Sequence, residues 1–176
     1  MRQDPKGILL LTGTLGSGKT TVAIEVGRQL ADSRVACAVI DLDWLCWVHS
    51  DTSISPCSLD KLILTNLLSL WPNFRSFGVE YLVLARALLD PALLASLTRE
   101  FSQTSITVVR LHASPQTIEE RLTRRDVGET LNEHRREVAA MTAAIEKVKL
   151  EHSVILNDGR SVADVARQVL DILAWN

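Results

Sequence analysis

The sequence predicts an α/β fold of three layers, in which a mostly parallel sheet of five strands lies between helices. Five short apolar runs, at 8–11, 35–40, 81–85, 106–111 and 154–156, contain almost no polar residues. Such runs are typical of strands buried on both faces of a parallel sheet. The segments between them repeat apolar residues every three or four positions, as helices do. Strands that alternate with helices favour a parallel sheet with right-handed crossovers.

The expected helices carry start signals. Ser114 places a capping residue before Pro115, which is compatible with a first helical turn. Ser161 with Asp164 three residues later resembles a capping box. A long helix is expected over about 130–149, because apolar residues recur along one of its faces. This helix could pack within the chain or across a homodimer, and the sequence does not choose between the two.

Composition narrows the function classes. The chain has 176 residues, which suits a single domain over 1–176, and 47% of them are hydrophobic. With a net charge of -2, it lacks the broad basic field that binds a nucleic-acid backbone. The first apolar run is too short for a signal peptide, and the region 81–97 is interrupted by Arg86, Asp90 and Pro91, so no membrane span is expected. We therefore expect no nucleic-acid or membrane partner.

The cysteines point to a reducing compartment. Cys37, Cys46 and Cys57 form no CxxC pair and have no metal-ligand spacing. Reduced thiols packed as small hydrophobic side chains, in a cytoplasmic protein, are the simplest interpretation.

A phosphate-binding motif follows the first apolar run. The segment from Gly13 to Thr20, GTLGSGKT, fits the P-loop pattern G-x-x-x-x-G-K-[ST] in full. Its glycines let backbone N–H groups face phosphate oxygens, Lys19 would reach the β- and γ-phosphates, and the Thr20 hydroxyl would bind Mg²⁺. A three-layer P-loop fold that binds ATP and Mg²⁺ is thus predicted. The expected nucleotide contacts are Gly13, Thr14, Gly16, Ser17, Gly18, Lys19, Thr20 and Thr21.

Two carboxylates follow the second expected strand. Asp41 and Asp43 stand where ligands bind in open α/β sheets, beyond the carboxyl ends of the strands. If the first and second strands are neighbours, both face the γ-phosphate. Asp41 could then serve the Mg²⁺ shell, and Asp43 could orient or deprotonate an acceptor hydroxyl. The alternative is a solvated turn.

The strand, the GTLGSGKTT loop, the helix and the Asp-x-Asp strand end resemble the small P-loop kinases. That group includes shikimate and gluconate kinases, chloramphenicol phosphotransferase and nucleoside monophosphate kinases. The resemblance implies ATP-dependent phosphoryl transfer, with Asp41 at the metal and Asp43 at the substrate. Shikimate itself is not expected, because Leu84 leads into Ala85-Arg86-Ala87 rather than a glycine triplet.

Arg121, Arg124 and Arg125 share one edge of the helix that begins after Ser114. The resemblance implies that arginines there contact ATP and the moving phosphoryl group, Arg121 and Arg125 as catalytic groups and Arg124 as a nucleotide contact. The sequence does not decide which of them does so, and ordinary charges near a helix C-terminus are the alternative. Segment 126–129 is expected to be an exposed loop.

The acceptor side is expected between Trp44 and Glu80, where Lys61 and Arg75 are the only Lys or Arg residues. This scarcity favours an acceptor without a phosphate. Trp47 and Arg86 are candidate substrate contacts, although both Trp44 and Trp47 could instead pack in the core.

The leading hypothesis is a kinase that moves the γ-phosphoryl group of ATP to a hydroxyl of a small molecule. A partner-regulated ATPase or nucleotide switch is the alternative, and a binding module without chemistry is a third. Asn157 to Gly159, after the fifth expected strand, is interpreted as a turn and a weak nucleotide contact.

Overall fold

The computed structural model describes residues 3–49, 55–173 and 175, in which strands and helices alternate along the chain. The strands are β1 (Gly7–Thr12), β2 (Cys37–Asp41), β3 (Tyr81–Ala85), β4 (Ser105–His112) and β5 (Ser153–Leu156). The helices are α1 (Lys19–Asp32), the short 3₁₀ helix η1 (Leu42–Leu45), α2 (Pro56–Ser76), α3 (Ala92–Glu100), α4 (Pro115–Arg125), α5 (Gly128–Val148) and α6 (Val162–Ile172). All five predicted strands are confirmed.

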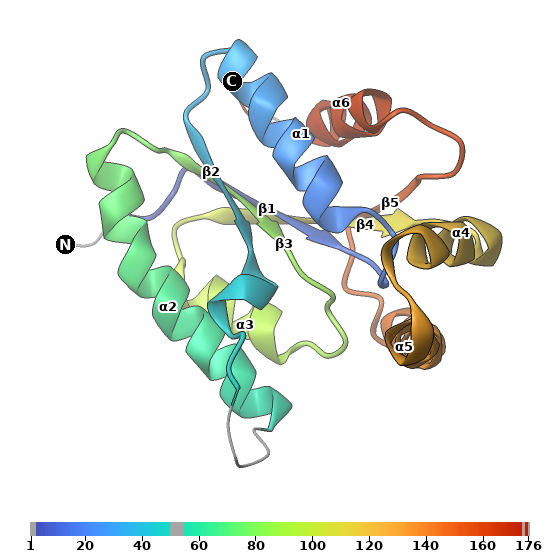
Figure 1. Cartoon of the computed structure of the whole chain (residues 1–176). Helices are drawn as coiled ribbons and strands as arrows, with labels where there is room; N and C mark the ends of the chain where they lie inside the picture. Colours follow the sequence, from blue (N-terminus) through green and yellow to red (C-terminus); the bar gives the residue numbers. More distant parts are fainter. Residues whose placement is uncertain (1–2, 50–54, 174, 176) are drawn as a thin grey trace.

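The sheet is parallel throughout, with the strand order β2-β3-β1-β4-β5. Helices α1 and α6 cover one face, and α2 and α3 cover the other (Figure 1). The prediction of three layers is therefore confirmed. The condition stated for the two aspartates, that the first two strands are neighbours, is not met, because β3 pairs with both of them. Register still brings the carboxyl ends of the three strands together, since Ala85 pairs with Leu11 on one side and Asp41 on the other.

Alternation along β1 divides its side chains between two cores. Ile8 and Leu10 pack with α2 and α3, whereas Leu9 and Leu11 pack with α1 and α6. All four are completely buried. The sheet is covered by helices on both faces, which explains why the sequence of this strand is continuously apolar.

The helix starts follow the predicted capping chemistry. The Ser114 hydroxyl accepts a hydrogen bond from the Thr117 N–H at 3.2 Å. The Ser161 hydroxyl accepts one from the Asp164 N–H at 3.1 Å. These side chains satisfy backbone donors that the first turn of a helix leaves unpaired.

Two local features differ from the sequence-based expectation. Helix α3 was not predicted, since it begins inside the apolar region 81–97, where continuous hydrophobicity hides a helical period. The exposed loop expected over 126–129 is shorter: Val127 is 82% exposed, but α5 begins at Gly128 and the Asp126 side chain is only 8% exposed. Burial of that carboxylate is explained by its partners, Arg125 and His134.

Within residues 3–49, 55–173 and 175, no helix is long and apolar enough to cross a membrane. The three cysteines are free thiols, as expected. Cys37 and Cys46 are partly buried, but Cys57 is exposed at the start of α2 and is not a core residue.

Candidate active site

The phosphate-binding motif lies between β1 and α1, at the carboxyl edge of the sheet. Gly18 precedes α1 with a φ of 94°, in the left-handed region that side chains rarely adopt. A Cβ on Gly13 would lie 2.5 Å from the Leu111 carbonyl oxygen, so this position also needs glycine. The loop therefore has the tight backbone that the motif predicted.

Ser17 lies inside this loop and is completely buried. Its hydroxyl has no hydrogen-bond partner among the residues that the structure describes. A buried hydroxyl without a partner is costly, and a polar ligand in the loop would satisfy it.

A cavity of about 430 Å³ opens between this loop, the end of β2 and helix α4. Its lining residues are Leu15, Gly16, Gly18, Lys19, Thr20, Thr21, Asp41, Asp43, Arg121, Leu122 and Arg125. Segments from three parts of the chain thus meet around one space.

Lys19 contributes a positively charged ammonium group to the lining of this cavity. Its Nζ donates to the Thr14 carbonyl oxygen at 3.0 Å. Burial lowers the pKa of Lys19, and the nearby carboxylates of Asp43 and Asp41 oppose that effect. Anionic oxygens in the cavity would offset the same desolvation, so the position suits a phosphate ligand.

Thr20 and Asp41 form a second pair of ligand groups. The Thr20 hydroxyl donates to Asp41 Oδ2 at 2.5 Å, and Asp41 Oδ1 accepts the Asp43 N–H at 3.0 Å. A hydroxyl and a carboxylate in contact fit the oxygen ligands that Mg²⁺ prefers. In the described part of the chain, no three His, Cys, Asp or Glu side chains gather to hold a metal ion by themselves. The pair would therefore need phosphate oxygens to complete a site.

Asp43 and Arg86 are joined by an ion pair through Arg86 Nη1. Arg86 Nη2 also lies 3.2 Å from Asp60 Oδ1, so the guanidinium bridges two carboxylates. Asp43 is 62% exposed beside the cavity, whereas the Arg86 side chain is only 17% exposed. Burial raises the pKa of Asp60, and Arg86 opposes that rise. Asp60 was not singled out in the sequence, because nothing in α2 marks it as facing β3.

The three arginines of α4 occupy different surroundings. Arg121 and Arg125 line the cavity, while the exposed Arg124 is not among its lining residues in the described part of the chain. Arg125 donates two hydrogen bonds to Asp126, at 2.8 and 2.9 Å. Both terminal nitrogens of Arg121 donate to backbone carbonyls, at 3.0 and 2.8 Å. The roles predicted for these arginines stay predictions: Arg121 and Arg125 both line the cavity, and both already donate hydrogen bonds within the protein.

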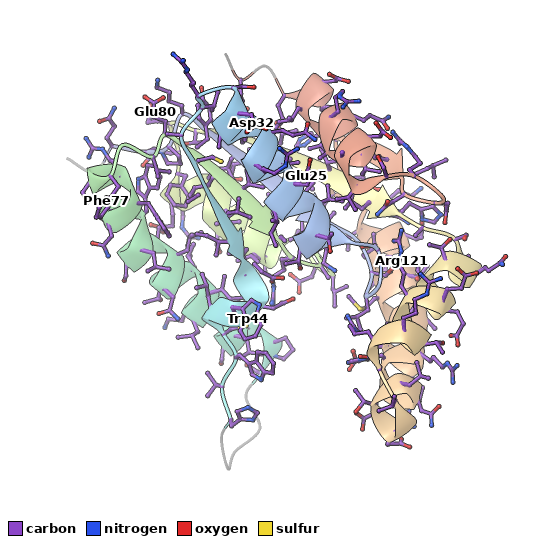
Figure 2. All side chains as sticks on the ribbon, turned by 45° about the horizontal axis from the view of Figure 1, so that its top comes forward. Glu25, Asp32, Trp44, Phe77, Glu80 and Arg121 are labelled. Atoms are coloured by element: carbon purple, nitrogen blue, oxygen red, sulfur yellow. The ribbon has the colours of Figure 1, made fainter. Side chains whose placement is uncertain are left out.

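Trp44 and Trp47 are exposed, by 67% and 63%, so the alternative that both pack in the core is wrong. Their ring centroids are 4.7 Å apart. Neither belongs to the residues lining the described cavity. Figure 2 shows Trp44 on η1 and Arg121 on α4, on two separate arms of the molecule. Substrate contact by Trp47 stays a prediction.

Asn157, which the sequence marked only as part of a turn and a weak nucleotide contact, lies against the phosphate-binding loop. It follows β5 and is only 4% exposed, and its side-chain Nδ2 donates to the Ser17 carbonyl oxygen at 2.7 Å. A polar residue directly after an apolar strand was the available signal, but a turn explained it equally well.

No protein-family model matches the chain, and no curated protein matches it significantly. Solved structures do. The APS kinase CysC of Mycobacterium tuberculosis, solved with AMPPNP and APS, is 22% identical with a TM-score of 0.61, over 96% of this chain and 98% of that one.

Two further solved structures are similar to this chain over nearly its whole length. The tunicamycin resistance protein of Deinococcus radiodurans is 19% identical with a TM-score of 0.64, over 99% of this chain and 98% of that one. A sugar kinase from Janibacter is 17% identical with a TM-score of 0.63, over 95% and 94%. The resemblance to small P-loop kinases is thus confirmed for the fold, over nearly the whole chain.

Proposed function

We propose that the protein is an ATP-dependent phosphotransferase that moves the γ-phosphoryl group to a hydroxyl of a small acceptor. One observation carries the proposal: a single cavity is lined by the P-loop lysine, the Thr20–Asp41 pair, the exposed carboxylate of Asp43 and Arg125. Phosphoryl transfer is catalysed mainly by positioning and charge neutralisation, which are the properties of this set.

The nucleotide side of the proposal rests on the loop and Lys19. Backbone N–H groups and the Lys19 ammonium would hold the phosphates, and the buried Ser17 hydroxyl would gain a partner. Thr20 and Asp41 would hold Mg²⁺, which when bound neutralises charge on the phosphate oxygens. The fold neighbour solved with AMPPNP and APS supports a nucleotide together with a second small substrate.

Asp43 is the proposed base. Its carboxylate lies at the cavity and is open to solvent, so an acceptor hydroxyl can reach it. As the hydroxyl oxygen attacks the γ-phosphorus, the bond to the β-phosphate oxygen breaks, ADP leaves, and the hydroxyl proton passes to Asp43. Arg125 would stabilise charge on the transferring group.

The surroundings of the carboxylates favour an acceptor without a phosphate. Arg86 is already committed to Asp43 and Asp60. Arg75 lies near the far end of α2 and donates to Gln3. A kinase of phosphorylated acceptors needs free guanidinium groups on this side, because bidentate arginines grip phosphate best.

ADP release tests the proposal. The purified protein is incubated with Mg-ATP and a panel of nucleosides, sugars, aminoglycosides and other hydroxyl compounds. Release that one compound stimulates supports the kinase and identifies its acceptor. Release that ignores every small molecule but responds to a protein partner would favour the regulated ATPase instead.

A further inference from the structure

Two side chains outside the P-loop motif donate hydrogen bonds to its backbone carbonyls. Arg121 Nη1 donates to the Gly16 carbonyl oxygen at 3.0 Å, and Asn157 Nδ2 donates to the Ser17 carbonyl oxygen at 2.7 Å. Arg121 Nη2 also donates to the Asn157 carbonyl oxygen at 2.8 Å. Arg121 and Asn157 are thereby connected to each other as well as to two consecutive peptide groups of the loop.

Holding a carbonyl also fixes the N–H of the same peptide. In a trans peptide the C=O and N–H point in opposite directions. When Asn157 holds the Ser17 carbonyl, the Gly18 N–H is therefore directed away from Asn157. The Gly16 peptide differs, because its N–H, that of Ser17, donates to Thr14 O at 3.3 Å. Arg121 therefore holds a turn of the loop rather than a phosphate donor. A loop that offers N–H groups to phosphate depends on such peptide orientations.

Packing leaves Asn157 little room to move. A Cβ on Gly18 would lie 2.8 Å from Asn157 Nδ2. The Asn157 N–H donates to His112 O at 2.8 Å, which fixes its backbone to β4. Its neighbour Asp158 accepts hydrogen bonds from the N–H and the hydroxyl of Ser114, at 2.8 and 2.9 Å. The β5–α6 loop, the start of α4 and the P-loop thus form one connected network.

We propose that Asn157 and Arg121 are positioning residues of the phosphate cradle, which hold the Gly16 and Ser17 peptides and so keep the loop in the shape that binds a polyphosphate. The proposal rests on the nucleotide site of the proposed function, but it needs no acceptor. It also separates Arg121 from Arg125, since Arg121 donates to backbone carbonyls of the loops whereas Arg125 donates to the side chain of Asp126. The alternative for Asn157 is direct contact with the adenine.

Inorganic tripolyphosphate, which has no adenine, distinguishes these two roles. Its dissociation constant and that of ATP are measured calorimetrically with Mg²⁺ for the wild type and Asn157→Ala. We expect both affinities to fall by a similar factor, about tenfold, because a buried carbonyl loses its donor. Asn157→Asp should weaken both further, since its carboxylate would face the Ser17 carbonyl oxygen and repel it.

Asn66→Ala is a matched control. Asn66 Nδ2 also donates to a backbone carbonyl at 2.7 Å, but to Leu45 in η1. It should lose the same kind of hydrogen bond without changing tripolyphosphate affinity. Loss of ATP affinity with unchanged tripolyphosphate affinity in Asn157→Ala would overturn the proposal in favour of an adenine contact. Unchanged affinity for both ligands would overturn it as well.

Arg121→Lys and Arg121→Met separate positioning from charge. A lysine keeps the positive charge but cannot reach two carbonyls in one plane as a guanidinium does. We therefore expect both variants to lose tripolyphosphate affinity to a similar extent. Retained affinity in Arg121→Lys would show that only charge matters and would remove Arg121 from the network. Absence of ATP and tripolyphosphate binding by the folded wild type would instead reject the nucleotide site itself.

Discussion

Replacing Asp43 by asparagine separates binding from transfer. The variant keeps the shape of the side chain but cannot accept the acceptor's proton. General-base catalysis contributes about 10²- to 10⁴-fold in rate, so the barrier should rise by about 3 to 5 kcal/mol. The affinity for Mg-ATP should remain close to that of the wild type, because Lys19, Thr20 and Asp41 are unchanged.

Stability cannot account for such a loss. Asp43 is 62% exposed, and Arg86 keeps Asp60 as a partner in the variant, so the ion pair that is lost should contribute only about 0 to 1 kcal/mol to folding. Thermal unfolding of Asp43→Asn should therefore follow that of the wild type closely. The assay combines ATP binding by calorimetry with single-turnover transfer to the identified acceptor.

Asp60→Asn is the matched control for this experiment. It removes the other carboxylate that pairs with Arg86 and leaves Asp43 in place. Transfer should stay within about tenfold of the wild type, the effect of one weakened ion pair. Equal losses in both variants would mean that Arg86, not a base at Asp43, limits the reaction. Full transfer by Asp43→Asn would remove Asp43 from the mechanism.

Three further predictions concern the loop, the core and acid stability. Lys19→Ala should abolish ATP turnover and weaken Mg-ATP binding, measured by ADP release and calorimetry, since the cavity loses its ammonium group. Gly27→Ala should lower the free energy of unfolding in urea by about 1 to 3 kcal/mol, because its Cβ would lie 2.4 Å from Val39 Cγ2. Hydrogen bonds from Arg125 lower the pKa of the Asp126 carboxyl to about 2, so its stabilising effect is present above pH 4 and disappears as the pH falls toward 2. The stability difference between the wild type and Asp126→Asn should shrink over that range in acid titrations followed by circular dichroism, and a difference constant down to pH 2 would contradict this reading.

The sequence predicted the parts of the fold that depend on local pattern. The apolar runs predicted the positions of the strands, because the sheet is buried on both faces. Ser114 and Ser161 predicted where two helices begin, because capping is a short-range interaction. Strand order was not accessible: the insertion of β3 between β1 and β2 depends on crossovers that no local pattern encodes. The register nevertheless placed Asp41 against Thr20, as a site at the carboxyl edge requires.

In the candidate site too, local motifs could be predicted from the sequence and long-range contacts could not. The motif identified Lys19 and Thr20 because its spacing is a chemical requirement. The hydrogen-bond partners of Arg86 and Arg121 could not be predicted from the sequence. Asp60 is 26 residues from Arg86, and Asn157 is 36 residues from Arg121. Contacts of that kind arise from packing, so a sequence shows the arginines and not the groups that hold them.

The central claim is that one cavity carries a γ-phosphoryl group from ATP to a hydroxyl, and isotopic labelling tests it most directly. The full chain is incubated with Mg-ATP labelled in the γ-phosphate and with the compound that stimulates ADP release, and the products are separated and identified by mass spectrometry. The proposed function predicts the label on a hydroxyl of that compound, in equal amount to ADP, with none from Lys19→Ala. Label recovered only as inorganic phosphate would contradict it.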